Sequence, residues 1–555
     1  MSGFFNNFYN NKVRRNFTVY NIFLASTVIL FTVVRLRHIN IAFERDEGEY
    51  AYAGQEILRG GLPFKDFYNM KMPGVYYIMA ILFKFFGDSV AAVRISLLCV
   101  NYLSAFFIFL TTRKFFDKNT GVAAAAIFLL YCLSYSAQGW TANAEHYVVM
   151  FGCAGLFFTV LARQKNQEAY LFPAGILMML AFICKQHGIG YLLFPFIWML
   201  YIGLWTTYFK RDRTKNSHLS ISDFQIPTSI TRSLLYYVAG ACLPFGIMLL
   251  YFWKMHILPN FYFLTFRYAD AYAAQQPPLI NIWHFRPIFW DNFGFWFLSF
   301  AFIYFSINKK IFIRQFGFFP ILFLCSLASI SLGWYYRPHY FQLFFPVAAI
   351  MSAWMLVRLR LFWNFRWLTP AGYILLAFAA TCIMQFDYFF AARDEIMVKM
   401  YGPSYFNEKK IIGAQISGSG QNSKDIEKSN NPKILVFGCE PQIFFYARQE
   451  SANGFMYMFP LLEYQRFAPA MIQQFITETE TAKPEMLIYF PDINDLAENE
   501  SQLTYLKKWF AEYSNQYNIV AQSYLKNGVS VMDWHTENQM RVCLDSTIAL
   551  IYKRK

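Results

Sequence analysis

The chain has 555 residues, of which 64 are Phe, 38 Tyr and 13 Trp. Charged residues make up 15% of it, whereas soluble domains carry roughly 25%, so the composition excludes an ordinary soluble enzyme. The formal charge is +15, but no basic stripe, RNA-binding motif or interleaved stacking surface accompanies it, and we expect no nucleic-acid partner.

Long apolar segments recur along the first 390 positions, near the length of about 18 to 20 residues that a ~30 Å hydrocarbon core requires of a helix. No small-residue cleavage site follows the first of them, so we expect it to be a retained helix. The pattern predicts a polytopic α-helical membrane protein with eleven spans: Phe17–Val34, Val90–Thr112, Val122–Ala137, His146–Ala162, Tyr170–Cys184, Gly188–Thr206, Leu234–Trp253, Ile288–Ile307, Phe316–Gly333, Phe341–Val357 and Leu368–Phe386.

The distribution of charge predicts the orientation. With the N-terminus inside, the inner segments hold 19 Lys and Arg against 4 acids, and the outer loops before Tyr388 hold 12 against 10. The positive-inside rule therefore predicts a cytoplasmic N-terminus. The apolar stretch Gly74–Phe86 has 13 residues and carries Lys84, so we expect it to lie along the outer surface rather than cross.

Two domains follow from this topology, a membrane domain of residues 1–387 and an outer domain of residues 388–555. The outer domain alternates helix-like stretches such as Ala468–Thr477 with short strand-like runs, which predicts a small α/β fold. Its cysteines, Cys439 and Cys543, are either a pair or two separate thiols. The predicted strands are Lys433–Gly438, Met486–Phe490, Asn518–Ser523 and Val529–Trp534.

The first outer loop holds the most concentrated set of acids. It reads RDEGEYAYAGQEILRGG from Arg45 to Gly61, and we expect Asp46 to cap a helix that Gly60 and Gly61 end. Capping would place the Asp46 carboxylate at the membrane surface beside Glu47 and Glu49. Such a carboxylate is either a base in an anion-binding site or a plain helix cap among solvated acids.

The loop continues as LPFKDFYNMKMPGVYYIMAILFKFFG, Leu62–Gly87. From Asp46 onward it resembles the polyprenyl-phosphate-sugar-dependent glycosyltransferases of the GT-C superfamily, which include protein mannosyltransferases, aminoarabinose transferases and the bacterial RgtA/B/C/D-like group. The resemblance extends to AVRISLL from Ala92, GWTANAEHY from Gly139, FICKQHG from Phe182, RPHYFQLFFP from Arg337 and ILVFGCEPQIFFYARQESANGFMY from Ile434. It implies a GT-C fold of about eleven transmembrane helices, juxtamembrane helices in the first outer loop and a periplasmic C-terminal domain, in the bacterial inner membrane.

This resemblance implies an enzyme that moves a sugar from a polyprenyl phosphate to an acceptor hydroxyl at the outer membrane surface, with inversion. Its partners would be the lipid-linked sugar, a protein, lipid or glycan acceptor, and membrane lipid. Asp46 matches the family's catalytic acidic residue and would act as general base, because a hydroxyl must lose its proton as the new bond forms. Glu47 is the second catalytic candidate.

The same resemblance implies a set of residues for the donor phosphate and substrate. Lys185 matches a lysine that contacts the lipid phosphate, although a lysine at a helix end also snorkels to the interface. Glu145 would orient a reactant or cap its helix. Arg337, His339 and Tyr340 would donate to phosphate or sugar, or belong to an interfacial aromatic and basic belt. Arg94 would serve the phosphate or pair with an acid of the first outer loop, and Arg59 and Lys71 would line the same groove.

Metal binding is where the sequence departs from some relatives. The aminoarabinose branch has Glu before its Lys-Pro-Pro, whereas Met70 precedes Lys71 here and Met72 follows it. His256 and His284 lack an acid at a defined spacing, which is weak evidence for zinc. We expect no cofactor and no required metal. The departures also leave the donor sugar open.

Two other classes of function compete with a transferase. A transporter would be polytopic too, but its ionisable residues should lie near the midplane on interrupted helices, and no repeated pair of interrupted spans is visible. The acids and bases here gather at the outer ends of helices. A non-catalytic binder of lipid-linked glycans is the other alternative, and the presence of Asp46 argues against it.

Overall fold

The computed structural model describes residues 2–209, 230–308, 317–359, 369–392, 395–396, 399, 406–419, 433–526, 529–534 and 547–555. The chain forms two compact units: unit 1 comprises Met1–Ile39, Arg94–Tyr251 and Pro278–Ala392, and unit 2 comprises Asn40–Val93, Phe252–Pro277 and Arg393–Lys555. Each unit combines separate segments of the chain, whereas the predicted domains were two continuous ranges, 1–387 and 388–555. The predicted domain boundary at residue 388 therefore remains a prediction.

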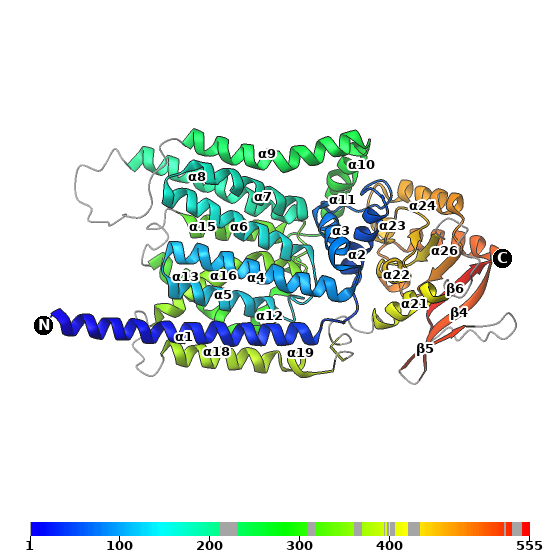
Figure 1. The fold of residues 1–555 in the computed structure, drawn as a ribbon. Coiled ribbons are helices and arrows are strands. Elements are labelled where there is room, and N and C mark those ends of the chain that lie inside the picture. Colours follow the sequence, from blue (N-terminus) through cyan, green and yellow to red (C-terminus); the bar gives the residue numbers. More distant parts are fainter. Residues whose placement is uncertain are drawn as a thin grey trace. The chain divides into compact units, whose positions relative to one another are not determined.

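Unit 1 is a bundle of helices, many of which run alongside one another (Figure 1). Its core contains α5, a helix buried along most of its length that contacts α1 and α16. Four consecutive alanines, from Ala123 to Ala126, let neighbouring helices approach α5 closely, because they project little side chain. The main helices are α1 (Ser2–Arg37), α4 (Val90–Phe115), α5 (Lys118–Cys132), α6 (Ala144–Lys165), α7 (Leu171–Cys184), α8 (Ile189–Phe209), α9 (Ile230–Lys254), α12 (Phe285–Asp291), α13 (Phe293–Asn308), α15 (Phe318–Ser331), α16 (Phe345–Val357), α18 (Pro370–Met384) and α19 (Phe386–Phe390).

The predicted spans coincide with apolar helices. Among the described residues, 6 helices are long and apolar enough to cross a membrane, or up to 7 if the pair bent by 113° at α12 and α13 counts as one span. The other four predicted spans coincide with shorter apolar helices of 10–17 residues, whose crossing stays a prediction. The thirteen-residue helix α3 (Gly74–Phe86) is the stretch expected to lie along the surface. The basic segment around Arg211 lies outside the described residues.

Unit 2 joins α2 (Arg45–Leu58) and α3 to the C-terminal fold. Helices α2 and α3 pack tightly, because a Cβ added at Gly54 would lie 2.8 Å from the Cβ of Met79. The other helices are α10 (Leu258–Tyr262), a π-helical turn (Phe263–Tyr268), α11 (Ala269–Ala273), α21 (Phe406–Ser419), α22 (Gln442–Ala447), α23 (Phe459–Leu462), α24 (Ala468–Ala482), α25 (Ile493–Leu496) and α26 (Glu500–Tyr513).

A mixed sheet forms the centre of the C-terminal fold. Its strand order is β2-β1-β3-β6-β4-β5, with β1 parallel to β2 and β3 and the other neighbours antiparallel. The four predicted strands are confirmed, and the sheet adds the short β2 and the C-terminal β6, which inserts between β3 and β4. The strands are β1 (Lys433–Phe437), β2 (Glu450–Ser451), β3 (Met486–Tyr489), β4 (Tyr517–Lys526), β5 (Val529–Trp534) and β6 (Thr547–Arg554).

Of the two cysteines predicted either to pair or to be separate thiols, the structure describes only Cys439. Cys439 is buried, and burial raises the pKa of its thiol to about 12. Cys543 lies outside the described residues, so the two alternatives remain open.

Candidate active site

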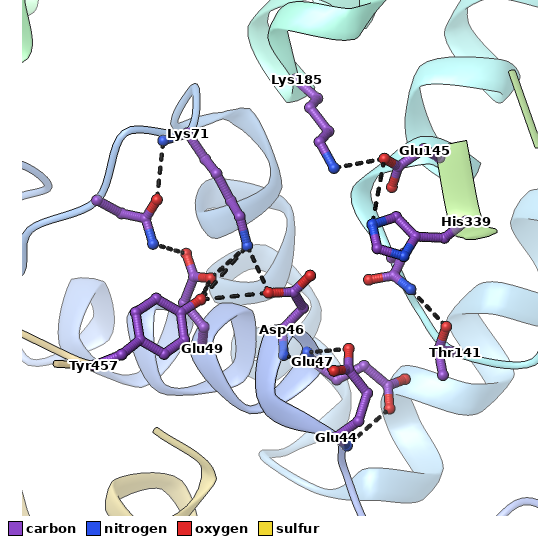
Figure 2. A network of polar contacts seen from close by, with 12 residues as sticks. Glu44, Asp46, Glu47, Glu49, Lys71, Thr141, Glu145, Lys185, His339 and Tyr457 are labelled. Atoms are coloured by element: carbon purple, nitrogen blue, oxygen red, sulfur yellow. Dashed lines mark hydrogen bonds and ion pairs between the residues drawn. The ribbon is translucent and has the colours of Figure 1, made fainter. Parts of the chain in front are cut away.

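The first turn of α2 is capped by Glu44, one residue before the helix. Its carboxylate accepts hydrogen bonds from the backbone N–H of Asp46 at 2.9 Å and of Glu47 at 3.1 Å, and the Glu47 carboxylate accepts from the N–H of Glu44 at 3.4 Å. This is a reciprocal capping box. The expectation that Asp46 is the cap is therefore wrong: Glu44 has the extended backbone of an N-cap, and Asp46 lies inside the helix. Figure 2 shows this turn.

Asp46 instead pairs with Lys71, which lies on the loop between α2 and α3. The Lys71 Nζ is 2.9 Å from Oδ1 of Asp46 and 2.6 Å from Oε2 of Glu49, one helical turn further along α2 (Figure 2). The phenol of Tyr457 donates to Glu49 and lies 3.5 Å from Oδ1 of Asp46. The ring of Tyr50 lies under the ammonium, with Nζ 4.7 Å from the ring centroid.

The two carboxylates beside Lys71 differ in exposure. The Glu49 side chain is 0% exposed, and its Oε1 accepts from Asn69 at 2.7 Å and from Tyr76 at 2.5 Å. Burial raises the pKa of Glu49 above its ordinary value, although Lys71 opposes the shift. The Asp46 side chain is 29% exposed. Asp46 is thus open to a reactant, whereas Glu49 is enclosed by protein donors.

Lys71 is held as a cation. Burial lowers its pKa, but the carboxylates of Asp46 and Glu49 outweigh this and raise the net pKa well above the ordinary lysine value. Its backbone N–H donates to the side-chain oxygen of Asn69 at 3.0 Å, and helix α3 begins three residues later after Pro73. The loop conformation therefore aims the ammonium at the first turns of α2.

Two sequence candidates of this region have other contacts. The capping box of α2 uses the Glu47 carboxylate, and Glu47 is buried. Arg59 follows the last residue of α2, about 20 Å from Asp46 at 1.5 Å per residue. Its guanidinium pairs with Glu56 at 2.5 Å and donates to the backbone oxygen of Arg448 at 3.0 Å. The structure does not group Arg59 with Asp46 and Lys71.

Unit 1 contains a second polar cluster. Lys185 lies where α7 ends, in an extended conformation before a short 3₁₀ turn, and its Nζ is 2.5 Å from Oε1 of Glu145 in the first turn of α6. The same Nζ lies 4.6 Å from the ring centroid of Tyr340. His339 places Nε2 3.9 Å from Oε1 of Glu145 (Figure 2). Its Nδ1 is 2.9 Å from the side-chain oxygen of Gln138.

Four sequence candidates therefore meet in unit 1: Glu145, Lys185, His339 and Tyr340. Arg94 packs on Trp140, 5.0 Å from its ring centroid, and donates to its backbone oxygen at 3.1 Å. Arg337 is exposed at the start of the same 3₁₀ helix as His339 and lies 5.2 Å from the ring centroid of Tyr335. Both arginines stack on aromatic rings.

Sequence reasoning missed the partners that complete these clusters. Tyr457 lies in a stretch that carries the family resemblance, but it is 408 positions from Glu49, and nothing in the sequence indicates their contact. Asn69 and Tyr76, which donate to Glu49, lie two and five positions from Lys71 in the sequence, and this proximity is a signal that could have identified them. Across the part of the chain that the structure describes, no three His, Cys, Asp or Glu residues are grouped as metal ligands.

Comparisons with known proteins place this fold. Residues 70–221 match the family model described as dolichyl-phosphate-mannose-protein mannosyltransferase. Comparison with curated proteins gives no match. The crystal structure of ArnT from Cupriavidus metallidurans bound to undecaprenyl phosphate matches at 14% identity and TM-score 0.57, covering 92% of this chain and 97% of ArnT.

Two structures of an archaeal oligosaccharyltransferase are also similar. The enzyme from Archaeoglobus fulgidus, tethered to an acceptor peptide, matches at 13% identity and TM-score 0.51, covering 95% of this chain and 75% of that one. The same holds for AglB from Archaeoglobus fulgidus in complex with an inhibitory peptide and a dolichol-phosphate. The resemblance predicted from the sequence is confirmed, and the chain has the GT-C glycosyltransferase fold.

Proposed function

We propose that the chain is a membrane glycosyltransferase that moves a sugar from a polyprenyl phosphate to an acceptor hydroxyl, with Asp46 as general base. The observation that carries the proposal is the partly exposed Asp46 carboxylate, ion-paired with Lys71 at 2.9 Å on the first turn of α2, in a chain with the GT-C fold. The relatives bound to undecaprenyl phosphate and dolichol-phosphate support a donor of that lipid class.

The chemistry assigned to Asp46 follows from its surroundings. The acceptor oxygen attacks C1 of the sugar, the bond from C1 to the phosphate oxygen breaks, and the phosphate leaves with the electron pair as polyprenyl phosphate. The acceptor proton passes to Asp46, which has an exposed face, whereas Glu49 is enclosed by Lys71, Asn69, Tyr76 and Tyr457. Direct displacement of this kind inverts C1.

The leaving phosphate requires cationic partners, because negative charge develops on its oxygen as the bond to C1 breaks. Lys71 is the cation nearest the proposed base, and we assign to it the stabilisation of charge on the phosphate as the glycosidic bond breaks. Lys185, with His339 and Tyr340 in the unit 1 cluster, is the second candidate for the donor phosphate.

The test is transfer by purified protein in nanodiscs from synthetic undecaprenyl- or dolichyl-phosphate sugars, compared with UDP- and GDP-sugars. Asp46→Asn should lower kcat by about 10² to 10⁴ with little change in donor affinity, the usual contribution of a positioned base. Glu47→Gln is the control, because it changes the neighbouring carboxylate, which takes part in the capping of α2. Thermal melting of both variants checks that they are folded. Transfer from a nucleotide sugar without lipid would refute the donor class, and near wild-type kcat in Asp46→Asn would refute the assigned base.

A further inference from the structure

Arg45 is an unusual residue to find at the N-terminus of a helix. It is the first residue of α2, directly before Asp46, where the helix dipole favours acids and disfavours a guanidinium. A strong partner compensates for this: Nε and Nη2 of Arg45 both donate to Oε1 of Glu440, at 3.1 Å and 2.9 Å. The Glu440 side chain is 0% exposed, so this is a substantially desolvated ion pair within unit 2.

Glu440 is itself fixed by a charged cluster from the C-terminal fold. Lys409 places Nζ 2.7 Å from Oε1 of Glu440 and 3.1 Å from Oδ2 of Asp492, and its side chain is 1% exposed. The side-chain amide of Gln442 donates to the other oxygen of Glu440 at 2.5 Å. Burial raises the pKa of Glu440, but Lys409 and Arg45 outweigh it and lower the net pKa, so Glu440 stays ionised.

Two more contacts hold the same turns of α2 against C-terminal residues. A Cβ added at Gly48 would lie 2.4 Å from the Cβ of Gln442, so the backbone of α2 packs directly against the first residue of α22. Tyr457 donates to Glu49 from a loop before α23. The first turns of α2 thus contact three points that follow residue 393, through Arg45, Gly48 and Glu49.

We propose that Arg45, held by Glu440, is a positioning residue that fixes the turn of α2 carrying Asp46, so that the C-terminal fold is a working part of the active site. The proposal rests on the proposed function, in which Asp46 is the base. Arg45 would not touch the reacting atoms. Its effect would pass through Asp46, because a base displaced by about 1 Å can cost about 10²-fold in rate.

The first test measures the conformation of α2 without any activity assay. Arg45→Gln and Glu440→Gln are made in the full chain in nanodiscs, and hydrogen exchange is followed in peptides covering the first turns of α2. Exchange of the Gly48 and Glu49 amides should be about tenfold faster or more than in wild type, the opening expected when a charge-assisted hydrogen bond is lost. The matched control is Arg448→Gln, which removes an exposed ion pair with Asp88 in the same unit. Unchanged exchange in both variants would overturn the proposal.

The second test asks whether Arg45 acts through Asp46. Arg45→Gln should lower kcat about 10- to 100-fold with little change in KM for donor, and Arg45→Lys should recover part of the loss because it keeps the charge but only one donor group. In an Asp46→Asn background, Arg45→Gln should have almost no further effect on kcat.

The outcomes separate the two proposals. If Arg45→Gln lowers kcat by the same factor in the wild-type and Asp46→Asn backgrounds, the positioning role is overturned, while Asp46 remains the base. Wild-type kcat in Asp46→Asn would refute the proposed base. If no lipid-linked sugar is transferred at all, the proposed function fails, and the exchange measurement alone decides whether Arg45 and Glu440 fix this turn.

Discussion

Removal of the Lys71 ammonium should make the stability of the protein depend on pH through Glu49. In Lys71→Met, the side chain of Glu49 stays buried among Asn69, Tyr76 and Tyr457 but loses its cation. Its pKa, already raised by burial, should then rise further. A raised carboxyl pKa stabilises the fold below the unfolded-state pKa, and that stability is lost as pH rises toward the folded-state value.

The magnitude is bounded by the cost of protonating Glu49. The ordinary pKa of a glutamate carboxyl is 4.5, and pH 7 lies 2.5 pH units above it, which limits the cost of protonation to about 3.4 kcal/mol at 1.36 kcal/mol per unit. At pH 5 the same limit is about 0.7 kcal/mol. The remaining neutral donors reduce the cost further. We therefore expect Lys71→Met to be destabilised relative to wild type by up to about 3 kcal/mol at pH 7 and much less at pH 5.

The assay is thermal melting of purified wild type, Lys71→Met, Glu49→Gln and the double variant in one detergent at pH 5 and pH 7. Glu49→Gln in the Lys71→Met background should restore most of the stability lost at pH 7, because it removes the buried charge. Equal destabilisation at both pH values, or no recovery in the double variant, would refute the reasoning that Glu49 is the group left unpaired.

Further predictions concern topology, the donor and packing. Reporter fusions at Arg211 and after residue 555 should give opposite signals, and equal signals would contradict the eleven-span orientation. Lys185→Ala should weaken binding of a lipid-phosphate sugar by roughly 2 to 5 kcal/mol, with Lys185→Arg recovering part, and unchanged donor affinity in titrations would exclude this contact. Gly48→Ala should lower the melting temperature, because overpacking against Gln442 costs about 1 to 3 kcal/mol. An unchanged melting temperature would show that α2 can move away from Gln442 at no cost.

The sequence alone was sufficient to predict the membrane class and the fold. Apolar runs of membrane-spanning length and the motifs after Asp46 depend on local composition, and both led to the GT-C fold that the comparisons bear out. The strands β1, β3, β4 and β5 were also predictable, because each is a short apolar run between polar segments. Strand β6 was missed, since its place between β3 and β4 depends on pairing with strands far from it in the chain.

The arrangement of the candidate site was decided by tertiary structure. Sequence reasoning singled out Asp46, Lys71, Glu145 and Lys185 by residue type and motif, but it placed Asp46 at the cap that Glu44 occupies. It also gave no indication that Tyr457 contacts Glu49 or that Glu440 pairs with Arg45. Motifs report residue types at fixed spacing. Polar contacts across about 400 positions, such as Arg45 with Glu440 and Tyr457 with Glu49, exist only once packing has brought distant segments together.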